Sequence, residues 1–107
     1  MKFVLSTSFS SVAHLTQLAP VADTHGWHAM SFSDHVANPE SISTPYPYTS
    51  DGQRRWPPFT DWPDPWVMIG ALSTITTRLR FTNNIFVLPM RNPFLVAKAI
   101  STAMASR

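Results

Sequence analysis

The sequence predicts an α/β fold built on a parallel β-sheet. Three short apolar runs alternate with stretches of helical periodicity, in the order strand, helix, strand, loop, helix, strand, helix. Strands that alternate with helices favour βαβ crossovers and therefore a parallel sheet. The strands are expected near residues 2–6, 27–32 and 79–86, and the helices near 12–25, 65–77 and 93–105.

The composition bounds the class of protein. A chain of 107 residues holds at most one domain, so we treat residues 1–107 as one unit. Only 13% of the residues are charged, against about 25% in a typical soluble domain. This low share indicates that much of the surface is covered by other protein. The net charge of +2 is scattered without a basic run, so no nucleic-acid partner is expected. The absence of Cys excludes a disulfide framework and thiolate metal ligands.

The sequence also indicates the cellular compartment of the protein. The apolar run Phe3-Val4-Leu5 is too short for the core of a signal peptide. No apolar run approaches the roughly 20 residues that span a bilayer. We therefore expect a cytoplasmic protein without a membrane partner.

The first predicted helix has clear start and stop signals, but a Pro lies inside its pattern. Ser10 or Ser11 can cap it, and Gly26 is a natural stop. Its apolar stripe consists of Leu15, Leu18, Ala19 and Ala22. Pro20 lies inside this pattern and removes one backbone hydrogen bond, at a cost of about 3 kcal/mol. A kink or an early break is expected near Thr16 to Pro20.

A long connection follows the second strand. Residues 36–63 are rich in Pro, Ser, Thr and Tyr and show no helical period. The connection carries the aromatic residues Tyr46, Tyr48, Trp56, Phe59 and Trp62. These large apolar side chains should pack against other parts of the protein. Two interpretations stay open: a surface Ω-loop held down by its own aromatic residues, or a lid over a substrate site.

The last two helices begin with the same signal. Asp64-Pro65 and Asn92-Pro93 each place a capping residue directly before a Pro at the first helical position. Their apolar stripes are Met68, Ala71, Leu72, Ile75 and Leu79 in one case, and Val96, Ala99, Ile100 and Ala103 in the other.

The candidate site lies at two strand ends. Asp34 and His35 come directly after the second strand, and Asn83, Asn84 and Ile85 come at the end of the third. In a parallel sheet these ends share one rim, which is where α/β folds bind ligands. The alternative is structural: an acid that caps a loop, an imidazole bonded to backbone, and amides that bond to the loop.

A metal site is not expected. His25, His28 and His35 together with Asp34 could supply nitrogen and oxygen ligands. A strand rises about 3.3 Å per residue, however, so His28 and His35 would lie about 20 Å apart.

A set of short motifs carries a resemblance to a known family. The motifs are Lys2-Phe3, Ser33-Asp34-His35-Val36, Tyr46-Pro47-Tyr48-Thr49, Asp51-Gly52, Trp62-Pro63-Asp64-Pro65-Trp66-Val67, Thr77-Arg78-Leu79-Arg80, Val87-Leu88-Pro89-Met90-Arg91-Asn92-Pro93 and Ala97-Lys98. In this order and spacing, over nearly the whole chain, they resemble the N-terminal part of a luciferase-like monooxygenase. The nearest branch resembles the coenzyme F420-dependent oxidoreductases.

The resemblance implies a fold and a chemistry. It implies a TIM (β/α)8 barrel that binds F420, or alternatively FMN, at the carboxyl ends of its strands. The implied activity is hydride transfer or flavin-mediated oxygenation on a small-molecule substrate. His35 would line the redox face and move or stabilise a proton, and Asp34 would orient the cofactor or the imidazole. Asn83, Asn84 and Ile85 would bind the cofactor, and Asn84-Ile85 falls where many relatives have a non-prolyl cis peptide.

The length does not match a whole barrel. A TIM barrel needs eight strands and about 250 residues, so under this resemblance we expect the chain to correspond to the first three βα units of an incomplete barrel. We expect the chain to be inactive by itself. It would form homo-oligomers or associate with the missing part of the barrel. The alternative function is a non-catalytic structural or interaction fragment, the product of a truncated gene or pseudogene.

Overall fold

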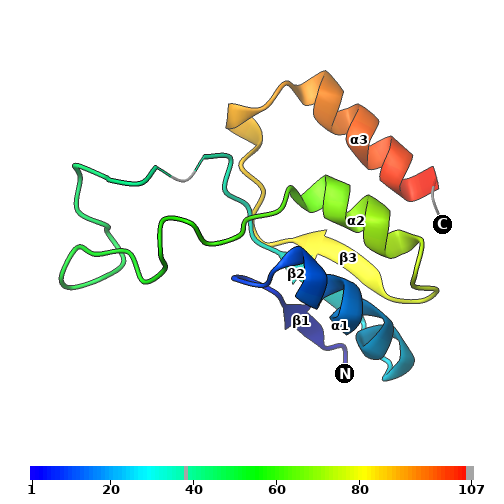
Figure 1. The fold of residues 1–107 in the computed structure, drawn as a ribbon. Coiled ribbons are helices and arrows are strands. Elements are labelled where there is room, and N and C mark those ends of the chain that lie inside the picture. Colours follow the sequence, from blue (N-terminus) through cyan, green and yellow to red (C-terminus); the bar gives the residue numbers. More distant parts are fainter. Residues whose placement is uncertain (38, 106–107) are drawn as a thin grey trace.

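The computed structural model describes residues 1–37 and 39–105 and contains one parallel sheet (Figure 1). The elements in this part of the chain are β1 (Val4–Ser6), α1 (Val12–Thr24), β2 (Ala29–Phe32), α2 (Pro65–Ser73), β3 (Arg80–Asn83), the 3-10 turn η1 (Leu88–Met90) and α3 (Pro93–Ala105). The strand order is β1-β2-β3, and both neighbouring pairs are parallel. The expected α/β class and element order are therefore confirmed.

The sheet register aligns the ends of the strands. Met30 is the partner of Leu5 on one side and of Phe81 on the other. The last pair joins Phe32 to Asn83, so β2 and β3 end together. Whatever follows these two strands lies at one edge of the sheet.

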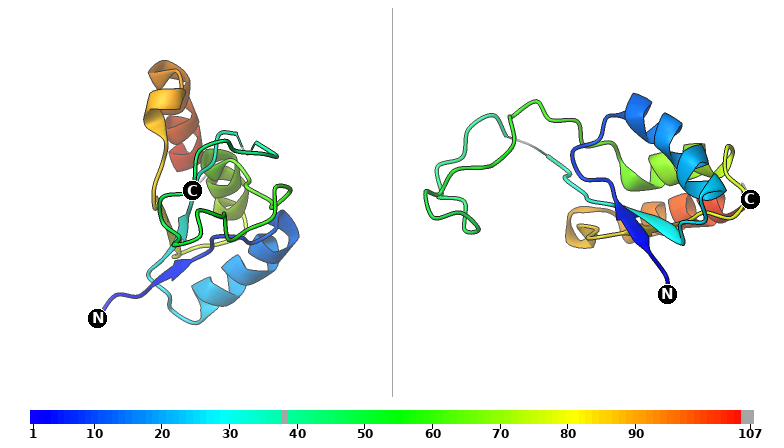
Figure 2. Two further views of the ribbon diagram at one scale, coloured as in Figure 1. Left: turned by 90° about the vertical axis from the view of Figure 1, so that its left-hand side faces the viewer. Right: turned by 90° about the horizontal axis from the view of Figure 1, so that it is seen from below.

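One core joins all three helices to the sheet, and the further views show α1 and α2 side by side (Figure 2). Met30 and Phe32 of β2 belong to this core. The other buried members are Leu15, Ala19 and Ala22 of α1, Met68, Ile69 and Leu72 of α2, Leu79, and Ala103 of α3. Burial of these apolar side chains, at about 25 cal/mol per Å² removed from water, is the main term that holds the layers together.

Side-chain caps fix where the helices begin. Ser11 accepts a hydrogen bond from the N–H of His14 at 3.2 Å. Asp64 Oδ1 accepts from the N–H groups of Trp66 and Val67 at 2.9 and 3.1 Å. Asn92 plays the same part for α3. The capping predictions at Asp64 and Asn92 are confirmed, and Ser11 rather than Ser10 caps α1.

Of the two outcomes expected near Thr16 to Pro20, a kink or an early break, the break is wrong, because α1 runs without interruption from Val12 to Thr24 with Pro20 inside it. The kink stays a prediction. The bond that Pro20 cannot donate would have ended on the carbonyl of Thr16, an exposed residue that solvent can reach. Leu15 and Ala19, on either side of this point, are both buried in the core. Packing therefore compensates for the lost hydrogen bond.

Helix α2 and strand β3 are shorter than expected: α2 ends at Ser73 rather than near 77, and β3 ends at Asn83 rather than at 86. At the helix end the Thr74 hydroxyl donates to the carbonyl of Ala71 at 2.7 Å, and the Thr76 hydroxyl donates to that of Leu72 at 2.8 Å. Such bonds offer the backbone an alternative to further helix.

A carboxylate from α1 organises the turn between α2 and β3. Asp23 accepts hydrogen bonds from the N–H groups of Thr77, Arg78 and Leu79 at 2.8, 2.9 and 2.7 Å. The Thr77 hydroxyl adds a fourth bond at 3.0 Å. These bonds, that of the Thr77 N–H first, lower the pKa of Asp23 to about 2. Asp23 thus ties the start of β3 to the end of α1.

We expect Asp23→Ala to lower the free energy of unfolding by about 1–2 kcal/mol at pH 7, after allowance for solvent screening of this partly exposed group. Because the pKa of Asp23 is lower in the folded state, its contribution is complete above pH 4 and is lost as the pH falls towards 2. Urea unfolding at pH 7, 4 and 2 measures this dependence. Asp61→Ala, at an exposed loop position, is the control. An equal loss at pH 2 and pH 7 would contradict this account.

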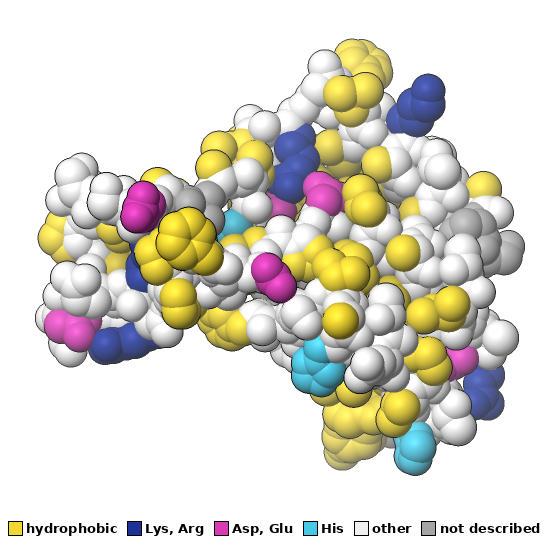
Figure 3. All heavy atoms as spheres, viewed as in Figure 1, with side chains coloured by type: hydrophobic (Ala, Val, Ile, Leu, Met, Phe, Trp, Pro, Cys, Tyr) yellow, Lys and Arg dark blue, Asp and Glu magenta, His cyan; other side chains and the backbone are white. Residues whose placement is uncertain are grey.

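The surface carries many apolar side chains. Figure 3 shows hydrophobic side chains scattered over this face of the molecule, with few charged side chains between them. Phe94 and Leu95 of α3 are 83% and 67% exposed, and Val67 of α2 is 71% exposed. Within the described ranges no helix has the length and apolar character needed to cross a membrane.

Candidate functional site

Five residues predicted from the sequence lie at the carboxyl edge of the sheet. Asp34 and His35 follow β2 directly, while Asn83 ends β3 and Asn84 and Ile85 continue from it. The N–H of Asn84 donates to the carbonyl of Phe32 at 2.7 Å, which extends the pairing of the two strands to the rim. His35 and Asn84 therefore stand on the same rim, as predicted, while the prediction that both can touch one planar ligand stays a prediction.

Asp34 is an anchor within the protein. Its side chain is 1% exposed. The guanidinium of Arg91 donates to both carboxylate oxygens, at 2.6 Å to Oδ2 and 2.7 Å to Oδ1, and the N–H of Val87 donates to Oδ2 at 2.8 Å. Such a fork on a carboxylate is among the strongest protein hydrogen-bonding arrangements. Because both oxygens are occupied in this way, Asp34 holds the loop after β3 against the end of β2.

Arg91 is a site residue that the sequence analysis missed. The hydrogen bonds to Asp34 raise the pKa of Arg91 above its ordinary value. Its Nη2 atom also lies 3.5 Å from Oδ2 of Asp64, the cap of α2. The guanidinium lies over the ring of Phe86, 4.3 Å from the centroid. A signal was present in the Arg91-Asn92-Pro93 motif, but nothing local identified its partner.

His35 lies among aromatic rings of the long connection. Its ring centroid is 4.2 Å from that of Trp62 and 5.5 Å from that of Trp56. Within the described part of the chain, its imidazole makes no hydrogen bond. Both indole nitrogens, of Trp56 and Trp62, are buried and also without a hydrogen-bond partner there. His35 therefore has free polar capacity inside an aromatic setting.

The long connection extends away from the layers of the fold as an arm (Figures 1 and 2). Its described residues, 36–37 and 39–63, contain no helix or strand. The arm is stiffened locally: the Tyr46 N–H donates to the carbonyl of Gly52 at 2.7 Å, and the Tyr46 ring lies 5.4 Å from that of Trp56. These contacts agree with a self-packed loop, and the contacts of Trp56 and Trp62 with His35 agree with a lid, so both interpretations stand.

The end of β3 offers amides and one apolar side chain. The side-chain oxygen of Asn83 is buried and has no hydrogen-bond partner among the described residues. Asn84 is exposed, and the Asn84–Ile85 peptide bond is cis. The Ile85 side chain is 72% exposed. This segment presents polar groups and apolar surface side by side.

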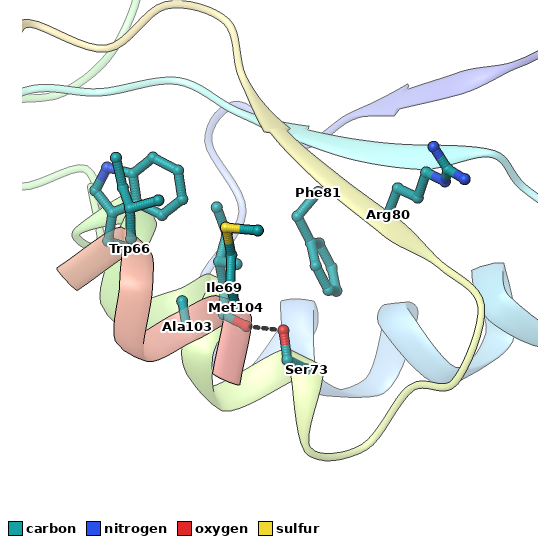
Figure 4. Close-up of a pocket in the computed structure, with 8 residues that line it drawn as sticks. Trp66, Ile69, Ser73, Arg80, Phe81, Ala103 and Met104 are labelled. Carbon is teal, nitrogen blue, oxygen red and sulfur yellow. Dashed lines mark hydrogen bonds between the residues drawn. The ribbon is translucent and has the colours of Figure 1, made fainter. Parts of the chain in front are cut away.

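Metal ligands and cavities were the other possible signs of a site. Within residues 1–37 and 39–105 no three His, Asp or Glu side chains lie close enough to hold a metal ion. A cavity of about 460 Å³ lies between α2, α3 and β3, and Figure 4 shows Trp66, Phe81 and Met104 in its wall. None of the five predicted site residues lines this cavity, so the rim is the candidate site.

Comparison with known proteins gives relatives of greater length. The chain is 33% identical over 105 residues to the uncharacterized protein Rv0940c of Mycobacterium tuberculosis and to the uncharacterized protein Mb0965c of Mycobacterium bovis. These alignments cover 98% of this chain and 36% of each relative. The uncharacterized protein Rv0953c of Mycobacterium tuberculosis is 29% identical over 84 residues, which is 78% of this chain and 30% of that protein. The chain thus spans about a third of the length of these relatives.

No solved structure matches the chain. The sequence model of the luciferase-like monooxygenase family matches residues 2–105, which is almost every position from the first strand to the end of α3. The chain therefore belongs to the luciferase-like monooxygenase family.

Proposed function

We propose that this chain forms part of the ring-binding rim of an F420-dependent oxidoreductase, with FMN as the alternative cofactor and a small molecule as substrate. In this proposal β1 to β3 and their helices are the first three βα units of a (β/α)8 barrel. Membership of the luciferase-like monooxygenase family supports the class of reaction.

The observation that carries the proposal is the shared edge of β2 and β3. His35, Asn83 and Asn84 lie at this edge, and the buried side-chain oxygen of Asn83 has no hydrogen-bond partner within the described chain. Ligands of parallel sheets bind at such carboxyl ends. A polar heteroaromatic ring has donors and acceptors along its edge and an apolar face, so it fits amides and an imidazole next to the exposed Ile85.

Each rim residue has a proposed role. The bound deazaflavin or flavin ring would supply the position that accepts or gives a hydride. The His35 imidazole would hold or move a proton at its free nitrogen, as imidazoles do near neutral pH. The amides of Asn83 and Asn84 would bind polar atoms of the ring edge, and Ile85 would pack against the ring. Asp34 would orient this edge through its bonds to Arg91 and Val87.

The activity of a whole enzyme requires more than this rim. The chain covers 36% of the length of relatives such as Mb0965c. The rim described here contains no cationic side chain free to hold a phosphate. Each charge-assisted hydrogen bond of a phosphate clamp contributes about 1.5–3 kcal/mol. We therefore propose that this chain alone binds the cofactor weakly and does not turn over substrate.

A second candidate is a structural or interaction role, favoured by the exposed apolar side chains of α2 and α3. Phe94, Leu95 and Met104 are 83%, 67% and 72% exposed. Large exposed apolar surface marks interaction sites. The partner would be a second copy or the remaining part of a barrel.

Titration of the purified chain with F420 and with FMN, followed by fluorescence, tests the proposal. We expect binding by the wild-type chain with a Kd above about 1 µM, and His35→Ala to weaken it by about tenfold, because a hydrogen bond and a ring contact are lost. His14→Ala, an exposed position on α1, is the matched control and should bind like wild type.

The outcomes separate the two candidate functions. Equal affinities of His35→Ala and wild type would place the ligand elsewhere and refute the role of His35. No binding of either cofactor, with stable oligomers in sedimentation, would favour the interaction role. Sub-micromolar binding by a monomer would show that affinity does not depend on a phosphate clamp from outside this chain.

A further inference from the structure

Arg91 joins three segments that meet at the rim. Its guanidinium forks onto Asp34, which follows β2. It also donates to the carbonyl of Val87 at 3.2 Å, within the loop that follows β3. Its third contact is Oδ2 of Asp64 at 3.5 Å, at the start of α2. One side chain thus reaches the exits of two strands and the entry of a helix.

These contacts are unequal in strength. The fork on Asp34 is short and its carboxylate is 1% exposed, whereas the carboxylate of Asp64 is 45% exposed and more distant. Solvent screens the second pair more than the first. The fork on Asp34 is therefore the contact that determines where the three segments sit.

The position of Asp34 determines that of His35, its neighbour in sequence. Val87 donates to the same carboxylate, so the segment that begins at Asn84 is held by the same group. The Phe86 ring, under the guanidinium at 4.3 Å, contacts the ring of Trp66 at a centroid distance of 6.0 Å. Arg91 therefore links both halves of the proposed ring-binding edge.

We propose that Arg91 is a positioning residue of the rim: through Asp34 it sets the place of the His35 ring relative to the Asn84–Val87 segment. This inference rests on the proposed function, because the proposed function supplies the ring that the aligned rim would bind. A planar fork is needed for this role, so Lys, which carries the charge as a single point, should not replace Arg91 fully.

Arg91→Lys is the main test, since it keeps the charge that balances Asp34. Two readouts apply to the folded protein, well below its unfolding temperature. The first is the position of the His35 ring signals in carbon–proton NMR spectra. The second is the Kd for lumiflavin, the flavin ring without its phosphate chain. We expect shifted His35 signals and binding weaker by about tenfold. Arg55→Lys, in an exposed pair with Asp51, is the control.

A purely structural role would give a different pattern. Arg91→Lys would then lower thermal stability but leave the His35 signals and the lumiflavin affinity of the folded protein unchanged, and this outcome would overturn the proposal. The NMR readout needs no ligand, so it stays decisive if the wild-type chain binds no flavin and the proposed function fails.

Asp64→Asn keeps the test decisive if Arg91→Lys does not fold. Asn is as good a helix cap as Asp, so α2 should keep its start while the weaker contact with Arg91 is reduced. We expect the His35 signals to stay in place, because the fork on Asp34 remains. A large shift of these signals would contradict the assignment of the positioning contact to Asp34.

Discussion

Leu72→Ala is expected to lower the free energy of unfolding by about 2–5 kcal/mol, a large share of the roughly 5–15 kcal/mol that typically stabilises a folded domain. Leu72 is 0% exposed and belongs to the core that joins α2 to the sheet. Truncation removes apolar contacts and leaves a cavity that the surrounding helices fill only in part. Urea unfolding followed by circular dichroism measures the loss.

The matched control for Leu72→Ala lies on the same helix. Val67→Ala removes apolar carbon atoms at a position that is 71% exposed, so the expected change is within about 0.5 kcal/mol. Equal losses for the two variants would mean that the exposed face of α2 is covered in solution, which would favour association.

Asp34→Ala is expected to cost about 3 kcal/mol of stability. The substitution leaves the guanidinium of Arg91, which is only 16% exposed, without its principal carboxylate, and it frees the N–H of Val87. Removal of one partner from a mostly buried ion pair is costly because the other charge stays desolvated. Thermal and urea unfolding at neutral pH measure the effect.

An exposed ion pair provides the control for Asp34→Ala. Asp51 and Arg55 have side chains that are 51% and 61% exposed, so Asp51→Ala should lower stability far less than Asp34→Ala. If Asp34→Ala lowered stability no more than Asp51→Ala, the fork would contribute little to stability and the positioning role of Arg91 would lose its basis.

The elements could be predicted because their signals are local. Asp64-Pro65 and Asn92-Pro93 start helices through bonds to backbone groups two or three residues away. The rim was predictable for a related reason, since parallel pairing alone brings the ends of β2 and β3 together.

The missed features depend on distant partners. Asp34 and Arg91 are 57 residues apart, and Asp23 and Thr77 are 54 apart, so neither pair leaves a pattern in a short window. The continuity of α1 through Pro20 depends likewise on the burial of Leu15 and Ala19 against other elements. Tertiary contacts outweighed the local preference there.

The arm between β2 and α2 has a consequence for how this fold can diversify. Pairing β3 with β2 closes a chain segment about twice as long as the one that pairs β2 with β1, yet each doubling costs only about 0.6 kcal/mol of chain entropy. The scaffold is therefore almost indifferent to the length of the arm. Insertions and substitutions in the arm can therefore accumulate while the sheet and its helices keep their sequence.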